Sequence, residues 1–404
     1  MNFANAILAV LAWLSLALGL WQWFAARRFP LHRRTEDFSF SPAITLLKPL
    51  KGDDETTAES LQSWFNQNYT GRTQILFGVA EANDPVCKIV RELIAENPGH
   101  DAQLVVCDRL TGANAKIAKL VQLEKLAKHD LILVSDADVR VPPDFLANLV
   151  APLRDPKIGL VNCFYRLANP ATTAMWWEAI AINADFWSQV LQAASLKPLD
   201  FALGAVMLTR RKLLEETGGF SALADCLADD YQLGHRIAKN GHRIALCPVV
   251  VECWDAPMNW SEVWKHQLRW ARTIRVCQAL PYFFSILSNA TFWPLLWLAS
   301  ELTRLSATTV RSTDFGSFQA SEIALRIPCG VMIAIALLLI RIVLAQNLQR
   351  RFTPEKNLVS PFWLVPVKDL LQVAIWLGAF AGSTVEWRGR RMKLRQDGTL
   401  VEER

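Results

Sequence analysis

The chain has 404 residues, of which 52% are hydrophobic and 20% are charged, and its formal net charge is +5. This composition excludes a disordered or fibrous protein, and so small a positive charge gives no reason to expect a nucleic-acid partner. The length predicts two or three domains. Sixteen Trp accompany only four Tyr. Trp favours the level of lipid headgroups. The average hydrophobic fraction, together with the many Trp, therefore predicts a soluble domain joined to a few membrane spans.

The eight cysteines are scattered along the chain, and none forms a C-x-x-C pair. Many of them lie inside apolar runs. This pattern is typical of reduced core residues in a cytosol-facing protein rather than of a disulfide framework.

Residues 1–26 carry no charge and are followed by four arginines between positions 27 and 34. About 20 apolar residues cross a bilayer as a helix. A cleaved signal peptide is disfavoured, because no basic residue precedes the run and large aromatic residues stand where small ones should be. We therefore expect an uncleaved anchor over 1–26, with the chain that follows in the cytoplasm by the positive-inside rule.

Residues 27–275 have the composition of a soluble domain, and strand patterns alternate with helix patterns along them. Such alternation predicts an α/β fold with a mostly parallel sheet covered on both faces, and ligands bind at the carboxyl ends of such strands. Strands are predicted over 43–47, 74–80, 104–107 and 131–134, and helices over 57–68, from 85 onward, over 114–128 and over 231–239.

Three apolar runs follow the soluble domain within residues 276–385, namely Val276–Ser300, Ile327–Ala345 and Leu370–Val385. Arg341 is expected to snorkel from the second run to the interface. A full crossing by the short third run would place the basic tail 386–404 outside, against the positive-inside rule. Either this segment is re-entrant or interfacial, or the tail breaks the rule, and the sequence leaves both alternatives open.

Two acidic pairs are candidate site residues. Asp136 and Asp138 flank Ala137 on a turn after a buried strand, and two carboxylates so spaced can share Mg²⁺ or Mn²⁺. Asp229 and Asp230 open a helix, where acidic residues can simply favour the helix dipole. Alternatively, a carboxylate there can be the base that removes a proton from an incoming hydroxyl.

Basic and aromatic residues mark two further helices. Lys116, at the start of one helix, suits phosphate together with the helix-start amides. His266, Arg269 and Trp270 lie in an amphipathic helix just before the apolar runs. That helix can be a juxtamembrane surface helix. Alternatively, Arg269 can balance diphosphate charge while Trp270 stacks on a sugar or lines an acceptor site.

The order of these motifs resembles the ceramide glucosyltransferase family, glycosyltransferase family 21, within the inverting glycosyltransferases of GT-A fold. The resemblance covers about residues 43–275 and the anchoring pattern. The motifs are Lys48-Pro49-Leu50-Lys51-Gly52, Asp84-Pro85, Gly112-x-Asn114-x-Lys116, Ser135-Asp136-Ala137-Asp138, Gly218-Gly219-Phe220, Asp229-Asp230-Tyr231 and His266-x-x-Arg269-Trp270.

The resemblance implies a role for each matching residue. Asp84 would hold the nucleotide, Asp136 and Asp138 the metal, and Asp230 would be the base. Arg269 and Trp270 complete the family's last motif, which usually begins with Gln or Arg; here His266 departs from that pattern.

The resemblance also implies a UDP-sugar donor, a membrane-lipid acceptor within the bilayer and a multi-pass protein with a cytoplasmic catalytic domain, as in a bacterial inner membrane. Bacterial hopanoid-associated glycosyltransferases resemble the same family, so ceramide and hopanoid stay open. A polyprenyl-phosphate sugar transferase, a processive polysaccharide synthase and a non-catalytic scaffold are weaker alternatives. The aromatic segment Trp176–Trp187 is predicted to be either an interfacial helix near the lipid entrance or core packing.

Overall fold

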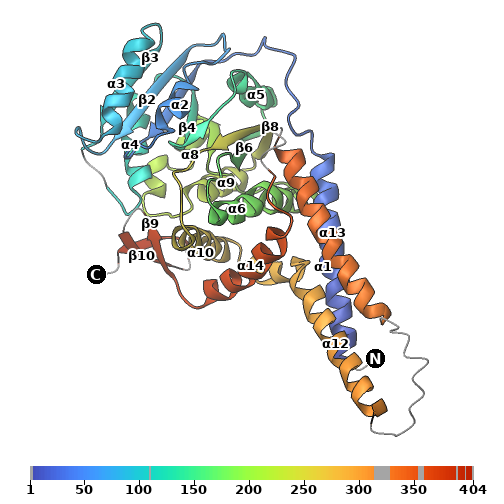
Figure 1. The fold of residues 1–404 in the computed structure, drawn as a ribbon. Coiled ribbons are helices and arrows are strands. Elements are labelled where there is room, and N and C mark those ends of the chain that lie inside the picture. Colours follow the sequence, from blue (N-terminus) through green and yellow to red (C-terminus); the bar gives the residue numbers. More distant parts are fainter. Residues whose placement is uncertain are drawn as a thin grey trace.

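The computed structural model describes residues 3–108, 111–313, 328–353, 359–387, 390–395 and 397–402. An α/β unit stands at one end of a group of long helices, as Figure 1 shows. The described start of the chain lies far from the sheet, at the outer end of these helices.

The α/β unit is built on an eight-stranded sheet with strand order β3-β2-β1-β4-β7-β6-β8-β5. Four strand pairings are parallel (β1–β2, β2–β3, β1–β4 and β6–β8), whereas β4–β7, β6–β7 and β5–β8 are antiparallel. The mostly parallel sheet is thus confirmed, with an antiparallel half that the sequence patterns did not predict. The strands are β1 (Ile44–Pro49), β2 (Thr73–Val79), β3 (Asp101–Val106), β4 (Leu131–Ser135), β5 (Val139–Arg140), β6 (Ile158–Leu167), β7 (Val206–Arg210) and β8 (Arg243–Cys253).

Both faces of the sheet are covered by hydrophobic cores. Neighbouring residues of one strand point to opposite faces, so they belong to different cores. Leu46 packs into one hydrophobic core and Leu47 into the other. The predicted helix over 57–68 is wrong at its end, since α2 stops at Gln62 while Trp64 and Phe65 stay buried beyond it. The covering helices are α2 (Thr57–Gln62), α3 (Val86–Glu96), α4 (Ala115–Leu126), α5 (Phe145–Val150), α8 (Arg211–Glu216) and α9 (Asp229–Lys239).

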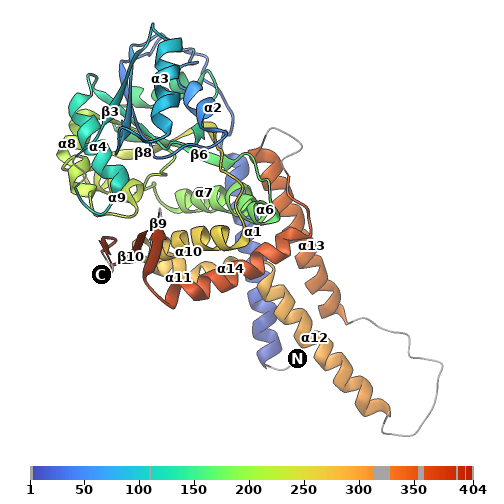
Figure 2. The same ribbon diagram turned by 60° about the vertical axis from the view of Figure 1, so that its left-hand side comes forward.

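The aromatic segment around Trp176–Trp187 forms α6 (Thr173–Ile180), a π-helical stretch η2 (Ala181–Phe186) and α7 (Trp187–Leu196). Trp177 and Trp187 are fully buried. Core packing therefore describes these two rings, because the segment lies between the sheet and the long helices (Figure 2).

The amphipathic helix that carries the last motif is α10 (Trp260–Cys277), which opens with a capping box between Asn259 and Glu262. The apolar run that follows is not one straight helix. It forms α11 (Ala279–Phe284), a 3₁₀ turn η4 (Ser285–Ser288) and α12 (Phe292–Thr313), with a bend of 44° between 279–288 and 292–306.

Within the described ranges, two helices are long and apolar enough to cross a membrane, or three if the bent pair counts as one span. They are α1 (Phe3–Arg28) and α13 (Cys329–Phe352). The first matches the predicted anchor. Arg341 does not snorkel from α13: its side chain is buried within the protein, because acidic groups of two other segments surround it.

The last apolar segment forms α14 (Leu364–Phe380), which packs against α10 and α6. The predicted run to Val385 is wrong at its end, because Val385 lies in β9 (Thr384–Trp387). With β10 (Arg390–Leu394) and β11 (Leu400–Glu402), it forms a small antiparallel sheet in the expected basic tail.

This small sheet packs on the α/β unit rather than away from it. Val385 and Leu400 are buried beside Leu227, and the Lys265 ammonium lies 3.0 Å from a Glu386 carboxylate oxygen. The described part of the tail therefore contacts the α/β unit.

The cysteines follow the expectation of reduced core residues. All eight are free and six are buried, whereas Cys277 is half-buried and Cys329 exposed.

Candidate active site

Lys116 joins two of the predicted acidic motifs. Its ammonium lies 2.8 Å from an Asp136 carboxylate oxygen and 3.2 Å from one of Asp229, and its side chain is only 10% exposed. Two carboxylates facing a cation raise the pKa of Lys116 despite its burial. The Lys116 motif, the turn after β4 and the start of α9 thus converge.

The helix that carries Lys116 is fixed in place by its own N-terminal residues. Asn114 caps α4: its side-chain oxygen accepts from the backbone N–H groups of Lys116 and Ile117, and its amide donates to the carbonyl of Cys226 at 2.8 Å. Gly112 adopts φ +88°, and a Cβ there would lie 2.7 Å from Ala224. Only glycine fits this turn against the segment that leads into α9.

Asp138 is half-buried among other acidic groups. Burial raises its pKa to about 7, and the neighbouring charges of Asp255 and Asp136 add to the shift. Lys48, at the end of β1, donates to the backbone carbonyl of Asp136 at 2.5 Å and to Ser135 Oγ at 3.3 Å. Burial lowers the pKa of Lys48 to about 7, against the opposing effect of Asp138 and Asp136.

Asp230, the predicted base, follows Asp229 in the first turn of α9. Burial raises its pKa to about 7, and the adjacent Asp229 charge contributes, while Lys116 opposes. A Cβ on Gly204 would lie 2.8 Å from an Asp230 carboxylate oxygen. The carboxylate thus lies close against the backbone of the segment that precedes β7, and its raised pKa suits a general base near neutral pH.

Asp84 lies at the carboxyl end of β2, but its carboxylate is engaged locally. It accepts from the backbone N–H of Gly52 at 3.0 and 3.2 Å and from that of Val86 at 3.1 Å. It thereby ties the loop after β1 to the start of α3. Among the described residues, Asp84 has no hydrogen bond or ion pair with Lys116 or Asp136.

His266 on α10 pairs with a carboxylate that the motifs did not reveal. Its Nδ1 lies 2.7 Å from Oε1 of Glu178 on α6, and Gln267 donates to the same oxygen at 2.9 Å. Glu178 is 1% exposed. Burial raises the pKa of the nearby Asp255. The charge of Glu178 adds to this increase, and His266 opposes it.

Trp270 forms an aromatic group with two other rings. Its ring centroid lies 6.4 Å from those of Tyr165 and Phe186. The His266 and Trp270 rings form a T-shaped pair with their centroids 4.6 Å apart. Arg269 precedes it on α10, where its backbone carbonyl accepts from Thr273 Oγ1 at 2.8 Å. The last motif therefore lies beside the end of β6 and near Asp255.

Sequence reasoning missed Glu178 and Asp255. Asp255 follows β8, a strand that was not predicted. Had that strand been predicted, the rule of inspecting the residues after each strand would have found Asp255. Glu178 carries no such signal, because it is one acidic residue in an apolar helical segment.

The acidic residues fit a divalent cation whose coordination a substrate completes. No cluster of three or more His, Cys, Asp or Glu side chains arranged for a metal occurs in the parts of the chain that the structure describes. Mg²⁺, however, usually binds proteins through one or two carboxylates plus water and substrate phosphates. Asp136 and Asp138 supply two; burial raises the pKa of Asp138, and the negative charges of Asp255 and Asp136, which a cation would offset, add to the shift.

Curated relatives of this chain include sugar transferases. Ceramide glucosyltransferase 3 of Caenorhabditis elegans is 24% identical over 220 residues, 54% of this chain and 48% of that protein. An N-acetylglucosaminyltransferase of Rhizobium leguminosarum bv. viciae is 24% identical over 246 residues, 57% of this chain and 55% of that protein. The chain thus spans about half the length of the curated relatives it matches.

Among solved structures, a mannosyltransferase from Pyrobaculum calidifontis, in complex with GDP-Man and Mn²⁺, superposes with a TM-score of 0.53 at 21% identity. The match covers 93% of this chain and 97% of that one, which shows a shared fold. The sheet is accordingly of the GT-A type. The family model described as Glycosyl transferase family 21 matches residues 7–400, nearly the whole sequence. The chain therefore belongs to glycosyl transferase family 21.

Proposed function

We propose that this protein is a membrane-bound inverting glycosyltransferase that moves a sugar from a UDP-sugar to the hydroxyl of a membrane lipid, with glucose and ceramide as the favoured pair. One observation carries the proposal: Lys116 links Asp136 of the turn after β4 to Asp229, directly beside the predicted base Asp230. Donor-binding and proton-accepting groups thus lie together at one edge of the sheet.

In this mechanism Asp136 and Asp138 would hold Mg²⁺ or Mn²⁺. When bound, the ion supplies Lewis-acid stabilisation of the departing diphosphate. Lys116 and Arg269 add positive charge to the donor side. Asp230 accepts the proton of the acceptor hydroxyl, which attacks the anomeric carbon from the face opposite the diphosphate. The configuration at that carbon therefore inverts.

The acceptor is assigned from the membrane parts of the chain. Residues 1–26 would anchor the protein, 27–275 would form the cytoplasmic catalytic domain, and 276–385 would contain the remaining membrane and interfacial helices. The tail 386–404 would stay on the cytoplasmic side. A lipid hydroxyl lies at the headgroup level, so α10 and α14 would bring the site against the bilayer surface.

A second candidate is transfer of N-acetylglucosamine to a hopanoid, which the rhizobial relatives favour through their sugar. A processive polysaccharide synthase is less favoured, because the described residues contain two or three candidate spans. Such an enzyme normally needs more spans to line a channel.

The test uses full-length protein in vesicles with Mn²⁺ and either UDP-glucose or UDP-N-acetylglucosamine. Ceramide, a hopanoid alcohol and a polyprenyl phosphate are supplied separately, and mass spectrometry reads the product. We expect a hexose-shifted ceramide, formed by the wild type and not by Asp230→Asn. N-acetylhexosamine on the hopanoid would establish the second candidate. Absence of any glycosylated lipid with every pair would refute lipid glycosylation.

A further inference from the structure

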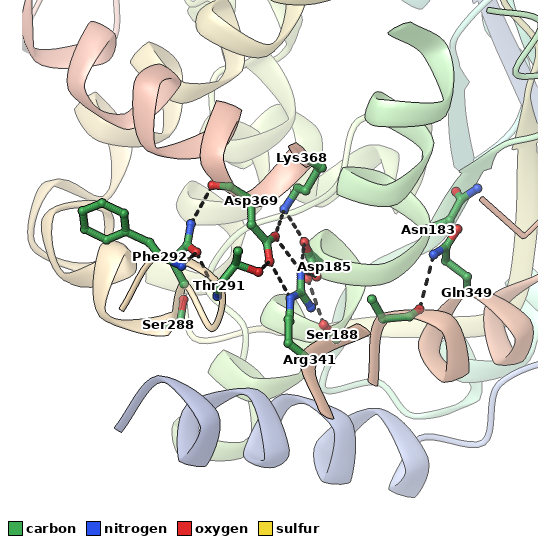
Figure 3. A network of polar contacts seen from close by, with 12 residues as sticks. Asn183, Asp185, Ser188, Ser288, Thr291, Phe292, Arg341, Gln349, Lys368 and Asp369 are labelled. Carbon is green, nitrogen blue, oxygen red and sulfur yellow. Dashed lines mark hydrogen bonds and ion pairs between the residues drawn. The ribbon is translucent and has the colours of Figure 1, made fainter. Parts of the chain in front are cut away.

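Four ionisable side chains form a buried, charge-balanced cluster where the α/β unit meets the long helices (Figure 3). Asp185 comes from η2, Arg341 from α13, and Lys368 and Asp369 from α14. Each residue is less than 10% exposed. Lys368 and Asp369, which directly precede the third apolar run, and the arginine expected to snorkel thus belong to one arrangement.

Arg341 is the centre of this cluster. One of its terminal nitrogens lies 3.0 Å from each carboxylate oxygen of Asp185. Nε and the same terminal nitrogen lie 2.8 Å from the two oxygens of Asp369. Lys368 also contacts both carboxylates. Two cations and two anions therefore neutralise each other across three segments.

The cluster also holds the bend between η4 and α12. Thr291 Oγ1 donates to Asp369 Oδ2 at 2.6 Å, and the Asn289 amide donates to the Asp369 backbone carbonyl at 2.8 Å. Figure 3 shows Thr291 and Asp369 directed toward one another. The Asp369 carboxylate thus connects α14, on which it lies, with the candidate spanning helix α13 and with the bend before α12.

Burying these charges gives little net stability compared with apolar packing, because desolvation offsets their attraction. Apolar side chains of similar volume would hold the same helices together. The planar guanidinium, in contrast, fixes distance and angle through paired hydrogen bonds. We therefore expect the cluster to fix the positions of its segments rather than to add much to the free energy of unfolding.

The segment that it places leads to the candidate active site. Asp185 immediately precedes Phe186, whose ring centroid lies 5.8 Å from that of Tyr165 and 6.4 Å from that of Trp270. On the other side, the Asn183 side chain bonds the backbone N–H and carbonyl of Leu167 at 3.1 Å each, at the end of β6. A π-helical stretch, often found at functional sites, connects these residues.

We propose that Asp185, Arg341, Lys368 and Asp369 are positioning residues for the lipid acceptor. They hold the aromatic group of Tyr165, Phe186 and Trp270 in a fixed place relative to the membrane helices, so that an acceptor hydroxyl in the bilayer meets Asp230. This inference rests on the proposed function. It assigns these four residues to acceptor use and not to donor binding.

The experiment compares wild type with the apolar quadruple variant Asp185→Leu, Arg341→Met, Lys368→Met and Asp369→Leu, in vesicles. Asp185→Asn, which keeps the shape of the side chain, is the milder second variant. The control removes an exposed ion pair of the sheet domain, Lys128→Ala with Asp101→Ala, whose atoms lie 2.7 Å apart. Two quantities are measured: transfer to the lipid acceptor, and affinity for UDP with Mn²⁺.

We expect both cluster variants to bind UDP as the wild type does, while their kcat/KM for the lipid falls by about tenfold or more. The control should keep both values. The inference is overturned if either folded cluster variant transfers sugar to the lipid at the wild-type rate. It is also overturned if Asp185→Asn loses UDP binding and transfer equally. Absence of transfer by the wild type itself would refute the proposed function instead.

Discussion

The imidazole Nδ1 of His266 lies 2.7 Å from Oε1 of Glu178, a carboxylate that is almost completely buried. The family's usual Gln or Arg at this position could donate to the same acceptor, because both side chains carry N–H groups. The departure from the motif therefore keeps a hydrogen-bond donor on α10 facing α6. The pairing also explains how a single acidic residue is tolerated in an apolar segment.

We expect His266→Gln to retain transfer activity, because an amide can replace the N–H donor. His266→Ala removes one of the two donors to Glu178 and leaves only Gln267, so it should lower kcat/KM by about tenfold. Steady-state kinetics with the lipid acceptor checks both. Full activity in the alanine variant would show that the pair has no part in transfer.

Asp230→Asn should reduce transfer by about 10²- to 10⁴-fold, the usual contribution of a general base. In the wild type, Asp230 must be deprotonated to accept a proton, and burial raises its pKa to about 7. Activity should therefore rise with pH, reach half its maximum near pH 7 and level off above it. UDP affinity should be unchanged in the variant. A flat profile of kcat/KM between pH 6 and 8 would contradict this assignment.

Lys116→Met removes the cation between Asp136 and Asp229 and leaves two carboxylates facing each other. Breaking such a buried pair costs about 3–5 kcal/mol, so Tm should fall and the KM for the UDP-sugar should rise. Lys116→Arg should lose less, since it keeps the charge. Lys125→Met, an exposed change on the same helix, is the control. Thermal unfolding and donor kinetics measure these effects, and a Lys116→Met protein with unchanged donor KM would remove the donor role.

Chelation should suppress transfer, and Mn²⁺ or Mg²⁺ should restore it, because Asp136 and Asp138 supply only part of a coordination sphere that donor phosphates complete. Asp138→Asn should require more metal for half-maximal activity. Titration of metal into the wild type and the variant, with UDP present, measures the difference. Transfer that persists in excess EDTA would exclude the metal from the reaction.

The packing of the tail on the α/β unit predicts membrane topology. Cys329 is the exposed cysteine at the start of α13, and Asp397 is exposed beside β11. In sealed vesicles of known orientation, an impermeant maleimide should reach Cys329 from the face opposite the catalytic domain. Asp397→Cys, in a Cys329→Ser background, should be labelled only from the domain's face. Labelling of both positions from the same face would disprove this arrangement.

Local patterns in the sequence determined the first half of the sheet. Strands β1 to β4 are short apolar runs ending in charged or turn residues, and a short apolar run bounded by turn signals is recognisable without any partner. The same holds for α1, α4 and the turn Asp136–Asp138. The rule that parallel strands share their carboxyl edge placed Asp136 and Asp138 at that edge, but the ion pairs of Lys116 with Asp136 and Asp229 came only from the structure.

The tertiary structure decided features whose partners are distant in the chain. Glu178 meets His266 across 88 positions, and Arg341 meets Asp185 across 156. No local pattern marks such pairs, because a buried charge is indistinguishable in sequence from a snorkelling one until its partner is placed. The sequence thus determined which chemistry the chain carries. Only the fold decided which charges are buried together, because that depends on packing between segments rather than on periodicity within them.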